Sequence, residues 1–163
     1  MSLKNNKGFT MIELLVVISI IGILAALAMV SFTSSQKQAR DSQRKSDLRQ
    51  YSTSLEGFGN QNNGLYPAYA VPSGVQASLS SGLCARLGLT NCSEDPKNIT
   101  DSSYPFYRYQ SNGTAVNGTA TAITYVLWGK LENSDNYWVV CSSGNVGAKA
   151  VAGFTVSGGI CPL

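Results

Sequence analysis

The chain has no histidine among its 163 residues. This absence excludes nucleophilic sites activated by histidine, histidine metal ligands, and the side chain that most often acts as general base near neutral pH. No serine, cysteine or carboxylate pair forms a recognisable catalytic arrangement in the remaining sequence. We therefore expect a protein that is not an enzyme and that uses no cofactor.

Charge is also scarce, because Asp, Glu, Lys and Arg make up only 13% of the residues and the net charge is +3. A net charge this small does not by itself argue for a nucleic-acid partner. Its distribution is uneven: residues 1–49 carry seven Lys and Arg against three acids, whereas residues 50–163 carry five against six. The basic excess therefore lies beside an N-terminal apolar segment.

Cysteine is limited to four residues, all beyond that apolar segment: Cys84, Cys92, Cys141 and Cys161. None forms a Cys-x-x-Cys pair, which argues against a zinc ribbon or a thioredoxin-like site. An even number of widely spaced cysteines in an exported chain favours two disulfides over four free thiols in a cytoplasmic protein. Three connectivities are open, and we favour Cys84–Cys92 with Cys141–Cys161 because sequential pairing closes two local loops.

The longest apolar run lies near the N-terminus, where residues 9–30 are almost all apolar and no charge occurs from Leu14 to Gln36. About 22 helical residues span about 33 Å, close to the roughly 30 Å hydrocarbon core of a bilayer. A transmembrane helix over residues 9–30 is therefore expected. Lys4 and Lys7 precede it, so the positive-inside tendency places the N-terminus in the cytoplasm.

A single carboxylate, Glu13, stands at the start of this helix. A disposable secretory signal, whose cleavage site would lie near residues 25–28, has no reason to carry a carboxylate that is costly in a bilayer. Two interpretations of Glu13 stay open. It either interacts favourably with the helix dipole from the first turn, or it requires a cationic partner.

The residues around Glu13 resemble a known processing site. The run from Lys7 to Leu14, KGFTMIEL, is similar to the N-terminal motif of type IV pilins and pseudopilins, and the similarity continues to Ala28. The resemblance implies that a prepilin peptidase cleaves after Gly8 and N-methylates the new terminus at Phe9. It also implies that Glu13, the fifth mature residue, neutralises the terminal amine of a neighbouring subunit and sets the register of assembly.

For the whole chain, the resemblance implies a structural subunit of a type IV pilus-like filament. Its implied partners are the prepilin peptidase/methyltransferase, identical or related pilin subunits, the inner-membrane assembly platform and membrane lipid. The implied location is the cytoplasmic membrane, single-pass with the N-terminus inside, and then a cell-surface or extracytoplasmic filament. The alternatives are a pseudopilin of a type II secretion or competence (DNA-uptake) machine, a signal-anchored extracytoplasmic binding domain, and a secreted enzyme.

The helix is expected to continue past the membrane over residues 31–59, where no proline occurs before Phe58. Apolar residues recur there at i, i+3, i+7 and i+10, namely Leu48, Tyr51, Leu55 and Phe58. This amphipathic stripe predicts a face packed on a globular domain. Many type IV pilins have proline at the position of Val30. This chain has no proline there, which leaves open whether its helix loosens near Gly22.

A basic cluster from Lys37 to Arg49 is interleaved with this stripe, and Asp41 and Lys45 are spaced for an i,i+4 ion pair. We favour a solvated helix face with internal ion pairs and contacts to lipid headgroups. DNA as a partner stays possible but is not supported by the cluster alone.

The rest of the chain, residues 60–163, predicts a globular extracytoplasmic domain of α+β class. Strands are expected over residues 106–109, 121–131 and 137–141, with residues 132–136 as a hairpin loop. About three antiparallel strands would pack on the helix, and a loose C-terminal tail would be tethered by a disulfide. The organisation is thus a leader (1–8), a membrane helix (9–30), its amphipathic continuation (31–59) and this domain.

Two weaker signals lie in residues 60–163. The stretch from Asn63 to Pro67 is similar to one in secretion pseudopilins and related pilins. Glu132 and Asp135, together with Asn133, are candidate calcium ligands, as found in some secretion pseudopilins, but their spacing matches no full calcium motif. A solvated hairpin turn is the favoured interpretation of these three residues.

Overall fold

A computed structural model describes residues 8–69, 71, 74–77, 82–98 and 106–163. The chain forms two compact units, Met1–Lys37 and Gln38–Leu163. We call them the N-terminal unit and the head unit. Helix α1 (Met11–Gln61) begins in the first and ends in the second. Its assigned range is close to the helix predicted from the sequence.

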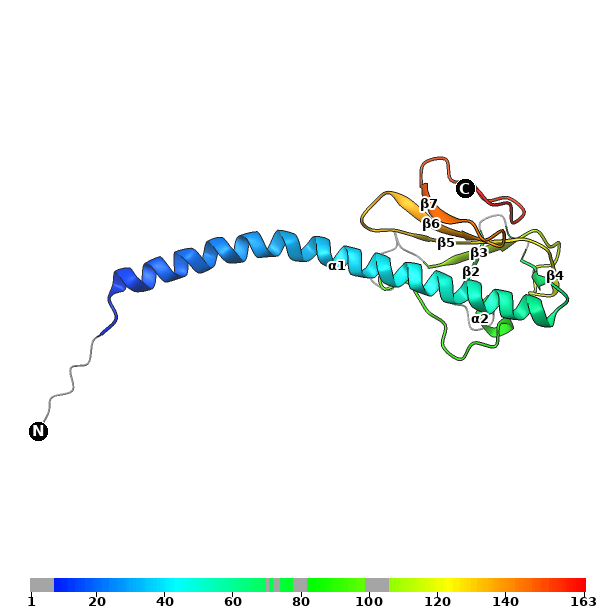
Figure 1. The fold of residues 1–163 in the computed structure, drawn as a ribbon, viewed down its shortest axis with the longest axis horizontal. Helices are drawn as coiled ribbons and strands as arrows, with labels where there is room; N and C mark the ends of the chain where they lie inside the picture. Colours follow the sequence, from blue (N-terminus) through cyan, green and yellow to red (C-terminus); the bar gives the residue numbers. More distant parts are fainter. Residues whose placement is uncertain (1–7, 70, 72–73, 78–81, 99–105) are drawn as a thin grey trace, which may run out of the picture. The chain divides into compact units, whose positions relative to one another are not determined.

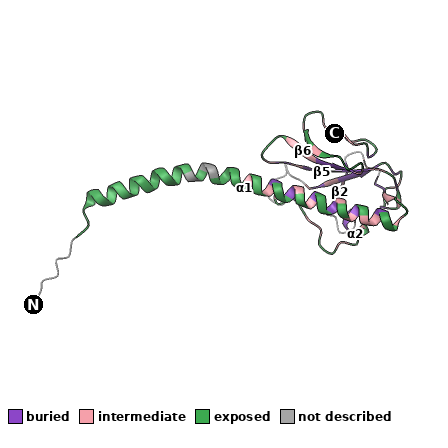
Figure 2. Ribbon diagram, viewed as in Figure 1, coloured by how far each residue is buried: buried purple, intermediate pink, exposed green. Residues whose placement is uncertain are grey.

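In the N-terminal unit the side chains of α1 are exposed over residues 11–27 and at Met29 (Figure 2). The large exposed apolar residues include Met11, Ile12, Leu14, Leu15, Ile18, Ile20, Ile21, Ile23, Leu24 and Leu27. Among the described residues, α1 is the one helix long and apolar enough to cross a membrane. The Ser19 hydroxyl donates to the Leu15 carbonyl at 2.8 Å, so its polar group is satisfied inside the helix.

The head unit is built on an antiparallel five-stranded sheet in the order β2 (Val75–Gln76), β3 (Arg108–Ser111), β5 (Tyr125–Lys130), β6 (Asn136–Cys141) and β7 (Val146–Ala150). A second, two-stranded sheet pairs β1 (Tyr66–Pro67) with β4 (Ala120–Ala122). A short helix, α2 (Leu83–Arg86), lies between β2 and β3 in the chain. The head part of α1 runs along one face of the larger sheet (Figure 1).

The two faces of this sheet carry two apolar clusters, because successive residues of a strand point to opposite sides. On one face Leu48, Tyr51 and Leu55 of α1 pack with a set that includes Tyr109 and Leu127. On the other face the C-terminal tail covers a smaller cluster formed by Val126, Trp128, Val139 and Cys141. The predicted amphipathic stripe is therefore the helix side of the core.

Close packing of α1 requires a small residue near the end of β5. A Cβ atom at Gly129 would lie 2.8 Å from the ring of Tyr107 and 3.4 Å from a methyl group of Leu48. The first of these separations is shorter than side chains tolerate, so any larger residue would push Tyr107 or the strand aside. Gly129 thus lets the helix approach the sheet at this point.

Two disulfides close loops in the head unit, Cys84–Cys92 and Cys141–Cys161. They are the two pairings favoured by sequential spacing. The first joins α2 to the segment that follows it, and the second ties the tail to the end of β6.

The sheet is larger than the three strands expected, because β2 and β7 extend it on both edges. Strand β7 falls in the tail predicted to be loose, where a tight turn containing Gly144 (φ 85°) folds it back onto β6. The single strand expected over residues 121–131 is divided into β4 and β5. The Asn112 side-chain oxygen accepts hydrogen bonds from the backbone N–H groups of Ile123 and Thr124 and interrupts the ladder there.

Candidate functional site

Among the described residues, none covers the predicted processing site in the N-terminal unit. Phe9 is 81% exposed, and no heavy atom lies within 4 Å of the position that a Cβ atom of Gly8 would occupy. Both residues precede the first turn of α1, in a segment without regular secondary structure. An extended, uncovered segment is the form in which a peptidase can bind the bonds that it cleaves.

Glu13 lies in the first turn of α1, where its carboxylate is held by Thr10. The backbone N–H and the hydroxyl of Thr10 both donate to Glu13 Oε2 at 2.8 Å, and the Glu13 N–H donates to the Thr10 hydroxyl at 3.3 Å. This is a capping box, which satisfies backbone groups that the start of a helix leaves open. Thr10 was not predicted as a functional residue, although the Thr-x-x-Glu spacing signals this arrangement.

A second cluster of functional interest lies inside the head unit, around Arg44 of α1. Its guanidinium is fully buried and forms a bidentate pair with Asp95, with Nε–Oδ2 at 2.7 Å and Nη2–Oδ1 at 2.8 Å. Nη1 also contacts Asp41 at 2.8 Å and Glu132 at 2.9 Å. Burial alone would lower the pKa of Arg44, but these hydrogen bonds raise it, so Arg44 is charged.

Glu132 connects this cluster to the loop between β5 and β6. Its carboxylate also pairs with Arg40, at 2.7 Å for both nitrogen–oxygen contacts, and lies 3.5 Å from Lys97 Nζ. Asp41 in turn accepts the backbone N–H groups of Glu132 and Asn133 at 2.8 and 2.9 Å. The loop is therefore held against α1 by both charge and backbone hydrogen bonds. We call Arg40, Arg44, Asp41, Asp95, Glu132 and Lys97 the ionic cluster.

The ionic cluster corrects two expectations about the basic residues between Lys37 and Arg49. Arg44 is part of the interior and not of a solvated face, because three carboxylates neutralise it. The ion pair that the structure gives Asp41 is with Arg44, at i,i+3, in place of the expected Lys45. The Lys45 ammonium lies 4.5 Å from the centre of the Trp138 ring, a cation–π contact.

The predicted calcium ligands Glu132, Asn133 and Asp135 do not form a shared cation site. Glu132 is saturated by arginine guanidinium groups, which a calcium ion would have to displace. Asn133 and Asp135 are exposed in the hairpin loop, and the Asp135 carbonyl accepts the Val151 N–H. Within the described residues, no three His, Cys, Asp or Glu side chains are grouped as metal ligands.

The pH dependence of the head unit should follow Glu132. The hydrogen bond from Arg40 lowers the pKa of Glu132 to about 2 from an ordinary value of 4.5, against the opposing effect of burial. A lowered folded-state pKa stabilises the fold above the unfolded value, and this stabilisation disappears as the pH falls towards the folded value. We expect up to about 3 kcal/mol to be lost between pH 4.5 and 2.

This expectation is tested by denaturant unfolding of the full chain in detergent across that pH range. Glu132→Gln should be less stable at neutral pH and should show a shallower acid slope. Glu94→Gln, at an exposed position, is the matched control and should keep the wild-type slope. Equal slopes in all three proteins would contradict the assignment to Glu132.

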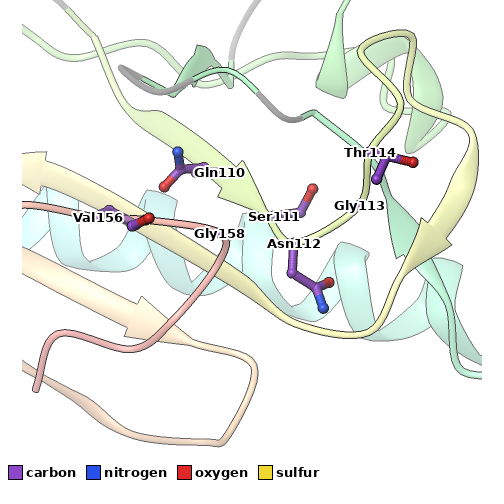
Figure 3. Close-up of a pocket in the computed structure, with 8 residues that line it drawn as sticks. Gln110, Ser111, Asn112, Gly113, Thr114, Val156 and Gly158 are labelled. Carbon is purple, nitrogen blue, oxygen red and sulfur yellow. The ribbon is translucent and has the colours of Figure 1, made fainter.

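A hollow of about 320 Å³ lies where the end of β3 meets the C-terminal tail (Figure 3). Its lining is Gln110, Ser111, Asn112, Gly113, Thr114, Val156, Ser157 and Gly158. All eight residues are uncharged at neutral pH, so the hollow offers neither acid–base groups nor an anionic ligand set for a metal.

Comparisons with known proteins agree with the N-terminal motif. Residues 3–29 match the family described as the prokaryotic N-terminal methylation motif. The type IV major pilin protein PilA of Myxococcus xanthus is 26% identical over 133 residues, which are 76% of this chain and 60% of that protein. No solved structure matches the chain significantly.

Two further relatives come from different systems. The type II secretion system core protein G of Pseudomonas aeruginosa is 32% identical over 104 residues, 64% of this chain and 66% of that protein. The type IV wide pilus major component PilA4 of Thermus thermophilus is 51% identical over 39 residues, 24% of this chain and 30% of that protein. The chain thus spans less than two thirds of the length of either PilA relative.

Proposed function

The chain belongs to the family of type IV pilins and type II secretion pseudopilins, and from that premise we propose that it is a structural subunit of a type IV pilus-like filament. It is cleaved by the prepilin peptidase after Gly8, N-methylated at Phe9, and assembled through α1. The observation that carries the proposal is the exposed Phe9 directly before an apolar helix whose described side chains are exposed up to Met29.

An apolar helix of this kind requires either lipid or other helices around it. Lipid tails and a bundle of apolar helices are similar environments, so moving α1 from one to the other is nearly neutral in hydrophobic free energy. Packing between helices and the few polar groups then decide whether subunits associate. The subunit is thus stored in the cytoplasmic membrane and transferred to the filament without exposing its helix to water.

Glu13 is the polar group that gives the assembly its register. Cleavage creates a positive amine at Phe9, and Glu13 lies four residues later, about 6 Å along the helix axis. An unpaired carboxylate inside an apolar bundle is costly, whereas a carboxylate paired with the amine of a neighbouring subunit is much less so. Only an axial offset that brings the two together is therefore stable.

The partners and the location follow from this sequence of events. Lys4 and Lys7 hold the N-terminus in the cytoplasm, where the peptidase/methyltransferase acts, and the disulfide-bonded head unit lies outside. Identical or related subunits, lipid and an inner-membrane assembly platform are the remaining partners, and the assembled filament is extracytoplasmic or on the cell surface.

The second candidate is a pseudopilin that forms a short filament in a type II secretion or competence machine. The similarity to protein G favours it, since that alignment has the higher identity and covers more of the relative than the PilA alignment from Myxococcus does. Long surface filaments built from this chain would favour the pilus; a short periplasmic assembly required for secretion would favour the pseudopilin.

The test of processing is the intact mass and N-terminal peptide map of the protein from its native membrane fraction. We expect a chain that begins at a methylated Phe9. The Gly8→Val variant should retain its leader. A bulky β-branched side chain would then stand directly before the scissile bond, where the wild-type residue has no side chain, and it should block cleavage. Gly22→Ala, at another open glycine within α1, is the matched control and should be processed normally. A wild-type chain that still begins at Met1, in cells with active peptidase, would contradict the proposal.

A further inference from the structure

The segment that follows α2 has three attachments, of which one is to α2 and two are to α1. The first is the disulfide from Cys92 to Cys84 of α2, and Cys84 is fully buried. The second is the Tyr51 hydroxyl, which donates to the Ser93 carbonyl at 2.8 Å. The third is the bidentate pair between Asp95 and Arg44. These attachments lie within four residues of one another along the segment.

Asp95 is the main counter-ion of a guanidinium that has no access to water. Arg44 is 0% exposed and Asp95 is 5% exposed, and both oxygens of Asp95 face Arg44. The carboxylate is further oriented by the Lys97 N–H, which donates to Oδ1 at 2.8 Å. A buried arginine that loses such a partner is strongly destabilised, so the position of the segment matters to the whole head unit.

The disulfide sets how far Asp95 can move from Arg44. Two residues separate Cys92 from Asp95, so an extended chain from one to the other spans only about 10 Å. Cys84 follows Leu83, which packs in the same core as Leu48 of α1. The bond at Cys92 therefore keeps the carboxylate close to that core even when its hydrogen bonds open. Without the bond, the segment depends on the Tyr51 hydrogen bond and the Asp95–Arg44 pair to stay beside α1.

We propose that Cys84–Cys92 is a redox-dependent latch whose formation places Asp95 on buried Arg44. In the oxidised head unit Asp95 is held on Arg44 and neutralises it. In the reduced head unit Asp95 lies on a segment that the disulfide no longer restrains. The link to assembly rests on the proposed function. The disulfide forms only after export from the reducing cytoplasm, so oxidised subunits are the ones whose head unit is rigid enough to assemble.

The oxidation is an ordinary thiol–disulfide exchange with a disulfide-bearing oxidant. The thiolate of one cysteine attacks the oxidant's disulfide, forms a mixed disulfide and releases one oxidant thiolate. The other cysteine, as its thiolate, then attacks the sulfur of the first and releases the second oxidant thiolate. The protein loses two electrons and two protons, and the oxidant gains both: its disulfide is reduced and its two thiolates are protonated to thiols.

Thermodynamic linkage between the disulfide and the Asp95–Arg44 pair allows the latch to be tested without measuring filament assembly. If the disulfide favours the Asp95–Arg44 pair, the pair favours the disulfide by the same factor. Weakening the pair should therefore make Cys84–Cys92 easier to reduce. Cys141–Cys161, which ties the tail to β6 on the opposite face of the sheet, should not respond.

The experiment equilibrates the full chain in detergent micelles with glutathione buffers of graded ratio, and maps each cysteine pair by alkylation and mass spectrometry. In Asp95→Asn we expect the Cys84–Cys92 midpoint to shift about tenfold towards reduction, with the Cys141–Cys161 midpoint unchanged. Arg40→Ala, which weakens the ionic cluster without touching Asp95, is the matched control and should leave both midpoints near wild type.

A cycle of unfolding measurements provides the second test. The increase in the unfolding constant caused by Cys84→Ser/Cys92→Ser should be several-fold smaller in the Asp95→Asn background than in wild type. The increase caused by Cys141→Ser/Cys161→Ser should be the same in both. Additive effects, or an equal shift of both disulfide midpoints in Asp95→Asn, would overturn the latch. If the variant lacking Cys84 and Cys92 does not fold, the redox titration decides alone.

Discussion

In the Arg44→Ala variant, the free energy of unfolding of the head unit is expected to fall by about 3–5 kcal/mol. The substitution leaves Asp41 and Asp95, which are 6% and 5% exposed, in the interior without their shared guanidinium. Domains of this size are stable by about 5–15 kcal/mol, so the loss is a large part of the total. It should appear as a melting temperature lower by more than about 10 °C.

The measurement is thermal and denaturant unfolding of the full chain in detergent, followed by near-ultraviolet circular dichroism of the tyrosines and tryptophans of the head unit. This signal is insensitive to the helix in the N-terminal unit, which micelles keep folded. Far-ultraviolet circular dichroism would mix the two units and hide the transition.

Two further variants show whether the stability lost in Arg44→Ala comes from the unpaired buried carboxylates or from the lost side-chain volume. Arg44→Lys keeps the charge but cannot form the bidentate pair with Asp95, so an intermediate loss is expected. Arg40→Ala removes a partly exposed partner of Glu132, which keeps Arg44 and Lys97, and should cost about 1 kcal/mol. If Arg44→Ala is no worse than Arg40→Ala, the ionic cluster does not stabilise the packing of α1 within the head unit.

The ionic cluster is a part of the fold that could not be predicted from the sequence. The apolar stripe of Leu48, Tyr51 and Leu55 was predictable because helical spacing is local. The same stripe continues through Arg44 and Asp41, which a hydropathy pattern assigns to solvent. They are buried because their partners arrive from 51 and about 90 residues away, at Asp95 and in the β5–β6 loop. Such pairing is a tertiary property with no sequence period.

The strands show the same limit. Strands β5 and β6 are rich in aromatic and β-branched side chains, and residues 121–131 and 137–141 were predicted as the strands of a hairpin. Strand β7 consists of Val, Gly, Ala, Lys and Ala, a composition with little strand preference. It forms because the turn at Gly144 returns the chain to β6 and a disulfide ties the following tail to that strand. Its existence depends on the neighbour and not on its own residues.

The N-terminal site, by contrast, is contiguous, and six residues contain all of it from Gly8 to Glu13. That is why a processing position, a terminal aromatic residue and a carboxylate partner could all be predicted from the sequence alone, and they stay predictions. The structure adds Thr10, whose backbone and hydroxyl groups hold the carboxylate. This contact gives Glu13 a second role within its own chain, as a helix cap, in addition to the proposed pair with a neighbouring subunit.

Glu13→Ala and Glu13→Gln are both expected to abolish filaments while the processed protein stays in the membrane. Losing one partner of a buried charge pair costs about 3–5 kcal/mol, a hundredfold or more in the association constant of each subunit. Insertion should be unimpaired, because an apolar or neutral residue is easier to place in a bilayer than a carboxylate. The measurements are the sheared-filament and membrane fractions, together with electron microscopy.

Glutamine is the variant that separates the two roles of Glu13. Its amide oxygen accepts the Thr10 N–H as the carboxylate does, so the helix cap survives while the charge is lost. Thr10→Val is the converse: it removes the hydroxyl bond and keeps the charge, and should assemble nearly as wild type. Filaments from Glu13→Gln but not from Glu13→Ala would assign Glu13 to capping alone, and the register would then have to come from helix packing.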